Sequence, residues 1–238
     1  MTQPIPRVPR APRIAAPHQA RLARHPSGFT LIELLVALAA MALLALVSWR
    51  GIEAMATAQA SHRARDDSVL VLQTTLSQWQ ADLDAVTAFG NLPALDWDGR
   101  ALRLTRRSAS GAGEANAHVV AWALRTDGNG TYWWRWQSPP LRTRSEWQQA
   151  WTLAAAWAQG GAQDLNATAT PLLPVAGWSL GYFRSGAWGP AMSSQQLGRQ
   201  TPIPDGLRLM LQLQPGAGLS GTVTRDWINP AYSVARGG

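Results

Sequence analysis

One carboxylate stands inside a long apolar stretch near the start of the chain. Residues 25–50 read HPSGFTLIELLVALAAMALLALVSWR, and Glu33 is the only acidic residue among them. A charged side chain at the centre of a membrane helix costs about 2.5 to 3.5 kcal/mol, so it is usually retained for a partner. Two interpretations follow. Glu33 either pairs with a cation, or it lies close enough to the helix end to reach water at the lipid headgroups.

The sequence has no second group of residues with the pattern of an active site or a metal site. Cysteine is absent, which excludes a thiolate nucleophile and a cysteine-ligated metal. The four histidines are not spaced as part of a triad or a metal cluster. Residues 96–99 and 127–130 resemble fragments of calcium loops, but neither continues with the required glutamate. We therefore predict no catalytic residue, no metal site and no cofactor, and we interpret both 96–99 and 127–130 as hairpin turns.

Tryptophan is abundant, with 13 residues in the chain. Aromatic side chains of this kind can stack on sugars or bases. Trp133, Trp134 and Trp136 lie in one predicted strand, along which side chains alternate between two faces. We therefore expect some of these indoles to lie in the core and others to be exposed at a subunit interface.

The apolar stretch has the length of a membrane-spanning helix. Residues 29–47 number 19, and as a helix they would span roughly 28 Å, close to the thickness of the bilayer hydrocarbon. Five arginines and no acidic residue precede Gly28, so the positive-inside rule places the N-terminus in the cytoplasm. A secretory signal peptide fits less well, because no small-residue cleavage site follows the stretch in a polar break.

The net charge of +7 looks at first like that of a nucleic-acid binder. Most of this surplus lies in the N-terminal segment. Removing the five arginines before Gly28 from the 21 basic residues leaves 16, against 14 acidic residues. The remaining chain is nearly neutral, so we expect no nucleic-acid partner.

The elements that position these residues begin with one long helix. No proline lies between Pro26 and Pro93, and Gly51 is the only glycine within 29–89, so we predict a helix of about 60 residues. Its outer half carries apolar residues at alternating spacings of four and three, which predicts a stripe packed against a core. The stripe consists of Leu72, Leu76, Trp79, Leu83 and Val86.

Strand and turn patterns follow the helix. Alternating or β-branched and aromatic segments predict strands at 100–106, 118–125, 131–137, 178–184, 207–213 and 222–228. Residues 145–148, with the sequence SEWQ, have the pattern of a capping box and predict the start of a short helix. The fold class is therefore α+β, with a long N-terminal helix, transmembrane in its first half, followed by a β-rich head.

Residues 28–38, with the sequence GFTLIELLVAL, resemble the processing site of type IV pilins and of the related pseudopilins of type II secretion. In that family a basic leader stays in the cytoplasm, and a prepilin peptidase cuts after the glycine. The resemblance implies cleavage between Gly28 and Phe29, N-methylation of Phe29 and a role for Glu33 in fibre assembly. A freed α-amino group has a pKa near 7.7 and needs a counter-charge in apolar surroundings, which Glu33 of a neighbouring subunit could supply.

Three further segments extend the resemblance to the J-type minor pseudopilin. They are SWRGIEAM at 48–55, GWSLGYFRSGAWG at 177–189 and PIPDGLRLMLQLQ at 202–214. The resemblance implies a structural subunit without enzymatic activity, placed at the tip of a periplasmic pseudopilus. Its implied partners are the I-type and K-type minor pseudopilins, the prepilin peptidase and the bacterial inner membrane.

The chain is thus expected to divide into four segments. These are a cytoplasmic leader over 1–28, a transmembrane helix over 29–50, a helical neck over 51–92 and a pilin-like periplasmic head over 93–238. Two alternatives for the function stay open. The chain could be a minor type IV pilin of a motility or DNA-uptake fibre, or it could be a membrane-tethered domain that binds or hydrolyses sugars.

Overall fold

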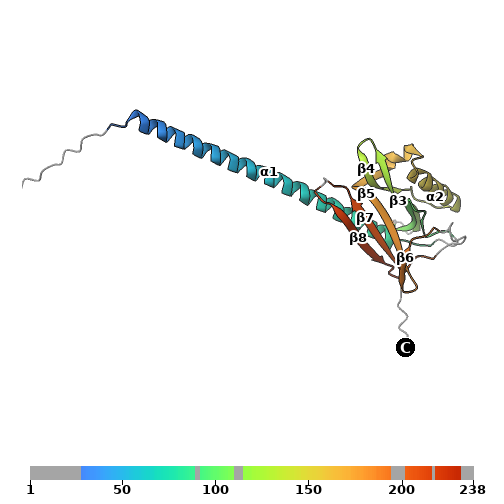
Figure 1. The fold of residues 1–238 in the computed structure, drawn as a ribbon. Coiled ribbons are helices and arrows are strands. Elements are labelled where there is room, and N and C mark those ends of the chain that lie inside the picture. Colours follow the sequence, from blue (N-terminus) through green and yellow to red (C-terminus); the bar gives the residue numbers. More distant parts are fainter. Residues whose placement is uncertain (1–27, 89–91, 110–114, 194–201, 216–217, 232–238) are drawn as a thin grey trace, which may run out of the picture. The chain divides into compact units, whose positions relative to one another are not determined.

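A computed structural model describes residues 28–88, 92–109, 115–193, 202–215 and 218–231 (Figure 1). Nearly all of the predicted leader therefore lies outside the described residues. The chain forms two compact units, Met1–Ala54 and Met55–Gly238. Helix α1, Leu31–Asp84, begins in the first unit and ends in the second. Its 54 residues confirm the long helix that the absence of proline predicts, with an end five residues earlier than Phe89.

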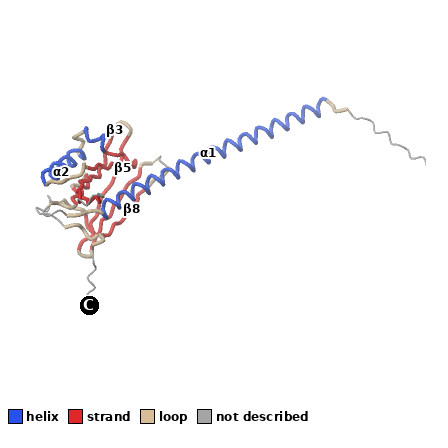
Figure 2. The backbone as a smooth tube through the Cα atoms, turned by 180° about the vertical axis from the view of Figure 1, so that it is seen from behind, coloured by secondary structure: helices blue, strands red, loops and turns tan. Residues whose placement is uncertain are grey.

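The second unit contains an antiparallel sheet and a second long helix (Figure 2). Neighbouring strands follow the order β1-β2-β3-β4-β5-β7-β8, and β6 pairs with β5. The strands are β1 Leu95–Trp97, β2 Ala101–Ala109, β3 Ala115–Asp127, β4 Gly130–Gln137, β5 Ala169–Arg184, β6 Ala187–Pro190, β7 Gly206–Leu213 and β8 Gly221–Ile228. Helix α2, Arg144–Ala158, and a 3-10 helix, Gln163–Thr168, connect β4 to β5. A long helix followed by an antiparallel sheet confirms the α+β class.

Both faces of the sheet are covered within this unit. Along β3, Val120 and Trp122 belong to one apolar cluster, and Val119 and Ala121 belong to another. Successive side chains of a strand point to opposite faces, so the two clusters lie on opposite sides of the sheet. The first contains residues of α1, and the second contains residues of α2.

The apolar stripe of α1 enters the first cluster as predicted. Trp79 and Leu83 are buried, and Leu72, Leu76 and Val86 are partly buried against them. The ring centroid of Trp79 lies 5.3 Å from that of Trp122 on β3 and 5.0 Å from that of Trp133 on β4. Indole contacts therefore fix the end of α1 to the centre of the sheet.

The expected division of the β4 tryptophans between core and surface is wrong. Trp133, Trp134 and Trp136 are all buried, with exposed fractions of 0%, 7% and 2%. Trp133 faces the α1 cluster, and the other two face the α2 cluster. Alternation still holds, but α2 covers the face that we expected to be open.

A buried carboxylate joins α1 to two strands. Asp82 has no exposed surface, and Arg135 of β4 donates to both of its oxygens, from Nε at 2.7 Å and from Nη2 at 2.9 Å. Arg106 of β2 donates from Nη1 at 2.7 Å, and the indole nitrogen of Trp122 donates at 2.9 Å. Charge-assisted and bidentate hydrogen bonds are the strongest that side chains make. The hydrogen bonds of Asp82 thus attach α1 to β2, β3 and β4.

Helix α2 has a capping box, two residues before the predicted position. The N-cap is Thr143, whose hydroxyl accepts from the backbone N–H of Glu146 at 3.2 Å. The Glu146 carboxylate in turn accepts from the backbone N–H groups of Arg142 and Thr143, which lower its pKa. The sequence pattern at 145–148 marked the correct helix with the wrong cap, because Thr-x-x-Glu at 143–146 satisfies the same rule.

We expect Thr143→Ala to lower the free energy of unfolding by about 1 kcal/mol, because the first turn of α2 loses its cap. Ser145→Ala, which changes the residue that the pattern first suggested, should leave stability nearly unchanged. Since Glu146 has a lowered pKa in the folded chain, its contribution is complete above its unfolded pKa and is lost as the pH falls through the folded value. Urea unfolding of both variants measures the difference, and equal losses would contradict the assignment of Thr143.

Candidate processing and assembly site

The segment that precedes α1 exposes the bond between Gly28 and Phe29. Both residues are non-helical, and Phe29 is 88% exposed. A Cβ atom added at Gly28 would find no heavy atom within 4 Å. The described residues therefore leave this peptide bond accessible to another protein, and none of them would contact a Cβ atom added at Gly28.

Glu33 caps the helix that carries it. Its Oε2 accepts from the backbone N–H of Thr30 at 3.1 Å and from the Thr30 hydroxyl at 3.0 Å. The hydroxyl oxygen of Thr30 accepts from the backbone N–H of Glu33 at 3.3 Å. These reciprocal bonds form a capping box, which satisfies donors that the first turn leaves free. The sequence interpretation missed Thr30, although Thr-x-x-Glu before an apolar run is the signature of this cap.

This geometry adds a third explanation to the two that the sequence offered for Glu33. The carboxylate has a local role in the isolated chain, independent of any partner. Both contacts with Thr30 use Oε2, and within the described part of the chain Oε1 has no hydrogen-bond partner. One oxygen is thus available for a cation while the other continues to cap the helix.

The part of α1 in the first unit carries mainly apolar side chains, and these are exposed. By length and composition, α1 could cross a membrane near the N-terminus, and the window that satisfies this test has no buried residue. Its large side chains include Leu35, Leu38 and Leu44, with exposed fractions between 54% and 68%. A surface of this size and polarity is unfavourable in water and suits hydrocarbon. This part of the helix suggests membrane anchoring.

Comparison with known families points to the same end of the chain. Residues 24–49 match the family model described as the prokaryotic N-terminal methylation motif. The chain carries an N-terminal methylation motif. The matched range includes Gly28, Phe29 and Glu33, and it ends before the second unit begins. With the long helix and the antiparallel sheet, the motif supports a type IV pilin-like or pseudopilin-like protein. Among curated proteins, none matches the chain.

The other acidic residues that were weighed as calcium ligands form turns and an ion pair. Asp127 accepts from the backbone N–H of Asn129 at 2.8 Å in the turn that joins β3 to β4, which confirms the predicted hairpin. Asp98 accepts from the backbone N–H groups of residues 100 and 101. Asp96 is buried and pairs with Arg103 at 2.8 Å. Within the described ranges, no group of three or more potential ligands could hold a metal ion.

Proposed function

We propose that the chain is a minor pseudopilin of a type II secretion system. The observation that carries the proposal is the methylation motif at 24–49, with a glycine, a phenylalanine and a glutamate in register before an apolar helix. The resemblance of the segments at 177–189 and 202–214 to those of the J-type supports that type in particular, and these segments lie in the second half of β5, in β6 and in β7. The subunit would lie at the tip of a periplasmic fibre and help to move folded proteins outward.

The proposed processing begins with the leader in the cytoplasm and the β-rich unit in the periplasm. The prepilin peptidase hydrolyses the bond between Gly28 and Phe29, and the new amino group of Phe29 is then methylated. This group is cationic at neutral pH, and in apolar surroundings it needs a counter-charge. Oε1 of Glu33 in a neighbouring subunit can supply one while Oε2 keeps its contacts with Thr30.

The role that we propose is structural, without catalysis. Three buried ionisable side chains of the second unit make contacts that hold the fold together. Asp82 binds two arginines, Asp96 pairs with Arg103, and His118 Nδ1 lies 2.9 Å from the carbonyl oxygen of Ser138. The I-type and K-type minor pseudopilins are the proposed partners of the β-rich unit, and the inner membrane is the proposed location of α1.

Deletion of the gene should abolish or strongly reduce secretion of folded proteins, and the wild-type gene should restore it. Glu33→Leu should fail to restore secretion, because the neighbouring ammonium group would lose its counter-charge, although the leader should still be removed. Glu53→Leu is the matched control, since it removes the next acidic residue along the same helix. Secreted protein in the medium and the intact mass of each variant are the measurements.

Normal secretion in the deletion strain would refute the proposal. Loss of surface motility or DNA uptake in that strain would instead favour a minor type IV pilin. If Glu53→Leu restores secretion as poorly as Glu33→Leu, loss of any acidic residue of the helix has the same effect. The proposed role of Glu33 as a counter-charge is then wrong.

A further inference from the structure

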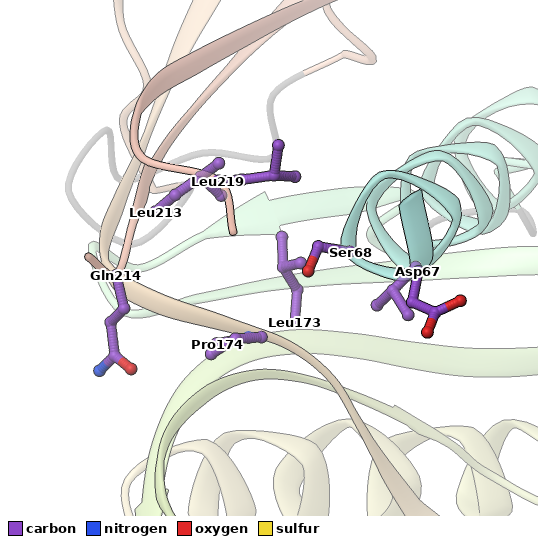
Figure 3. A pocket seen from close by; sticks show the side chains of 8 residues that line it. Asp67, Ser68, Leu173, Pro174, Leu213, Gln214 and Leu219 are labelled. Atoms are coloured by element: carbon purple, nitrogen blue, oxygen red, sulfur yellow. The ribbon is translucent and has the colours of Figure 1, made fainter. Parts of the chain in front are cut away.

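An apolar pocket lies in the second unit, between α1, the first half of β5 and the end of β7 (Figure 3). Val71 and Asp67 line it from α1, Leu173 and Pro174 line it from β5, and Leu213 lines it from β7. Leu219, which follows β7, completes the apolar wall. Figure 3 shows Leu173 and Leu219 projecting into the space beside the helix.

A close backbone approach holds one wall of this pocket in place. Gly218 has a φ of +75°, and a Cβ atom built on it would lie 3.2 Å from the Cα of Arg65 and 3.2 Å from the hydroxyl of Ser68. Only glycine adopts this conformation at such a distance without displacing the helix or the loop. The backbone at Gly218 is therefore packed closely against α1, next to Leu219 in the wall of the pocket.

The size and the lining of the pocket indicate what it can hold. Its volume is about 190 Å³, below the range of roughly 300 to 1,000 Å³ that is typical of small-molecule sites. The lining is mostly apolar, and its polar members are Asp67, Ser68 and Gln214. These dimensions suit one or two apolar side chains from another protein better than a cofactor or a sugar.

The charge beside the pocket defines the partner further. Asp67 is exposed, and among the residues that the structure describes it has no ion pair. Asp67 and Val71 are four residues apart on α1, so they lie on one face of the helix, one turn apart. A partner helix with an apolar residue and, three or four positions away, a lysine or arginine could match both at once.

We propose that this pocket docks a helix of a neighbouring fibre subunit. The partner inserts an apolar side chain against Val71 and Leu173, and its basic residue pairs with Asp67. The proposal rests on the proposed function, because the neighbouring subunits are those of the fibre. It assigns a specific contact to the part of α1 that lies in the second unit, at Asp67 and Val71.

Two pairs of variants test the contact in the full-length chain. Val71→Asp and Asp67→Arg place a charge in the pocket and reverse the charge beside it. Leu70→Asp and Asp66→Arg make the same changes at neighbouring exposed positions that do not line the pocket. Each tagged chain is purified from membranes in detergent, and the co-purified subunits that carry a methylation motif are measured by mass spectrometry. Unfolding midpoints of the four variants establish that all of them fold.

We expect Val71→Asp and Asp67→Arg to reduce capture of one neighbouring subunit by at least about tenfold, as the loss of a central interface contact does. The Leu70 and Asp66 variants should capture it within about twofold of wild type. Replacing the basic residue of that subunit's helix with aspartate should restore capture by Asp67→Arg. This charge exchange distinguishes a direct contact from a general effect on the surface.

The outcomes separate this inference from the proposed function. If wild type captures such a subunit and all four variants capture it equally, the docking site is wrong and the pseudopilin proposal stands. If wild type captures no subunit that carries the motif, both proposals fail. If only Val71→Asp and Asp67→Arg reduce capture of the subunit, and no basic-to-aspartate change in that subunit restores capture by Asp67→Arg, the ion pair with Asp67 is refuted.

Discussion

Asp82→Ala will lower the free energy of unfolding of the β-rich unit by about 3 to 5 kcal/mol, the cost of removing one partner from a buried ion pair. Arg135 and Arg106 would keep their largely buried positions without the carboxylate that pairs with both of them, since their side chains are only 16% and 23% exposed. The indole nitrogen of Trp122 would also lose its acceptor. Because domains are stable by about 5 to 15 kcal/mol, this change removes a large share.

Urea unfolding of the full chain in detergent, followed by tryptophan fluorescence, measures this loss. Asp84→Ala is the matched control. Asp84 lies two residues further along α1, is exposed, and accepts a single hydrogen bond from the indole nitrogen of Trp227 at 2.8 Å. Its removal should cost about 1 kcal/mol. Equal losses for the two variants would show that the Asp82 contacts are no stronger than one ordinary hydrogen bond.

Gly28→Val will leave the leader attached to nearly every chain, if the proposed processing is correct. Among the described residues, no heavy atom lies within 4 Å of a Cβ atom added at Gly28, so we expect the fold of the β-rich unit to be unchanged. Any loss of cleavage must therefore arise in the peptidase, whose site would have to admit a branched side chain at the scissile bond. Intact mass after expression with the prepilin peptidase gives the fraction of cleaved chains.

Gly51→Val is the control for this experiment, because Gly51 also has no heavy atom close to an added Cβ atom and lies within α1, away from the proposed cleavage bond. Chains with this change should be cleaved after Gly28, with Phe29 at the new N-terminus. Efficient cleavage of Gly28→Val at the same bond would contradict the role of Gly28. Cleavage of wild type at a position beyond residue 47 would remove the support that the motif gives to the pseudopilin proposal.

Local patterns were sufficient for the long helix and for most strands. The spacing of Leu72, Leu76 and Trp79 predicted which face of α1 meets the core, because a helix repeats every 3.6 residues wherever it packs. Alternation predicted β7, in which Leu209 and Leu211 are buried between less buried neighbours. These signals are contained within a few consecutive residues.

Other features depended on residues far away in the sequence. Asp82 lies among polar residues beside the apolar stripe, and nothing near it in the chain indicates that Arg106 and Arg135 will reach it. The first half of β5 was missed because Pro171 and Pro174 argue against a strand, although both positions pair with β4. The three-residue β1 and four-residue β6 are too short to show a pattern.

The candidate site could be proposed from the sequence because its motif is linear. Gly28, Phe29 and Glu33 fall within one short stretch that a family model also matches. The pocket beside Asp67 could not be predicted, because its walls come from α1, β5 and the segment after β7. Only the folded chain brings Leu173 and Leu219 to the same side of the helix.

The fastening of α1 by Asp82 has a mechanical consequence. A force applied along a helix is carried by its hydrogen-bonded backbone to the side chains that hold its far end. In α1 these are Trp79, Asp82 and Leu83, all buried against the sheet. Resistance to forced unfolding is a kinetic property, governed by the rate at which such contacts separate. The rate at which the ion pairs of Asp82 separate would then determine how long the β-rich unit stays folded under a constant force.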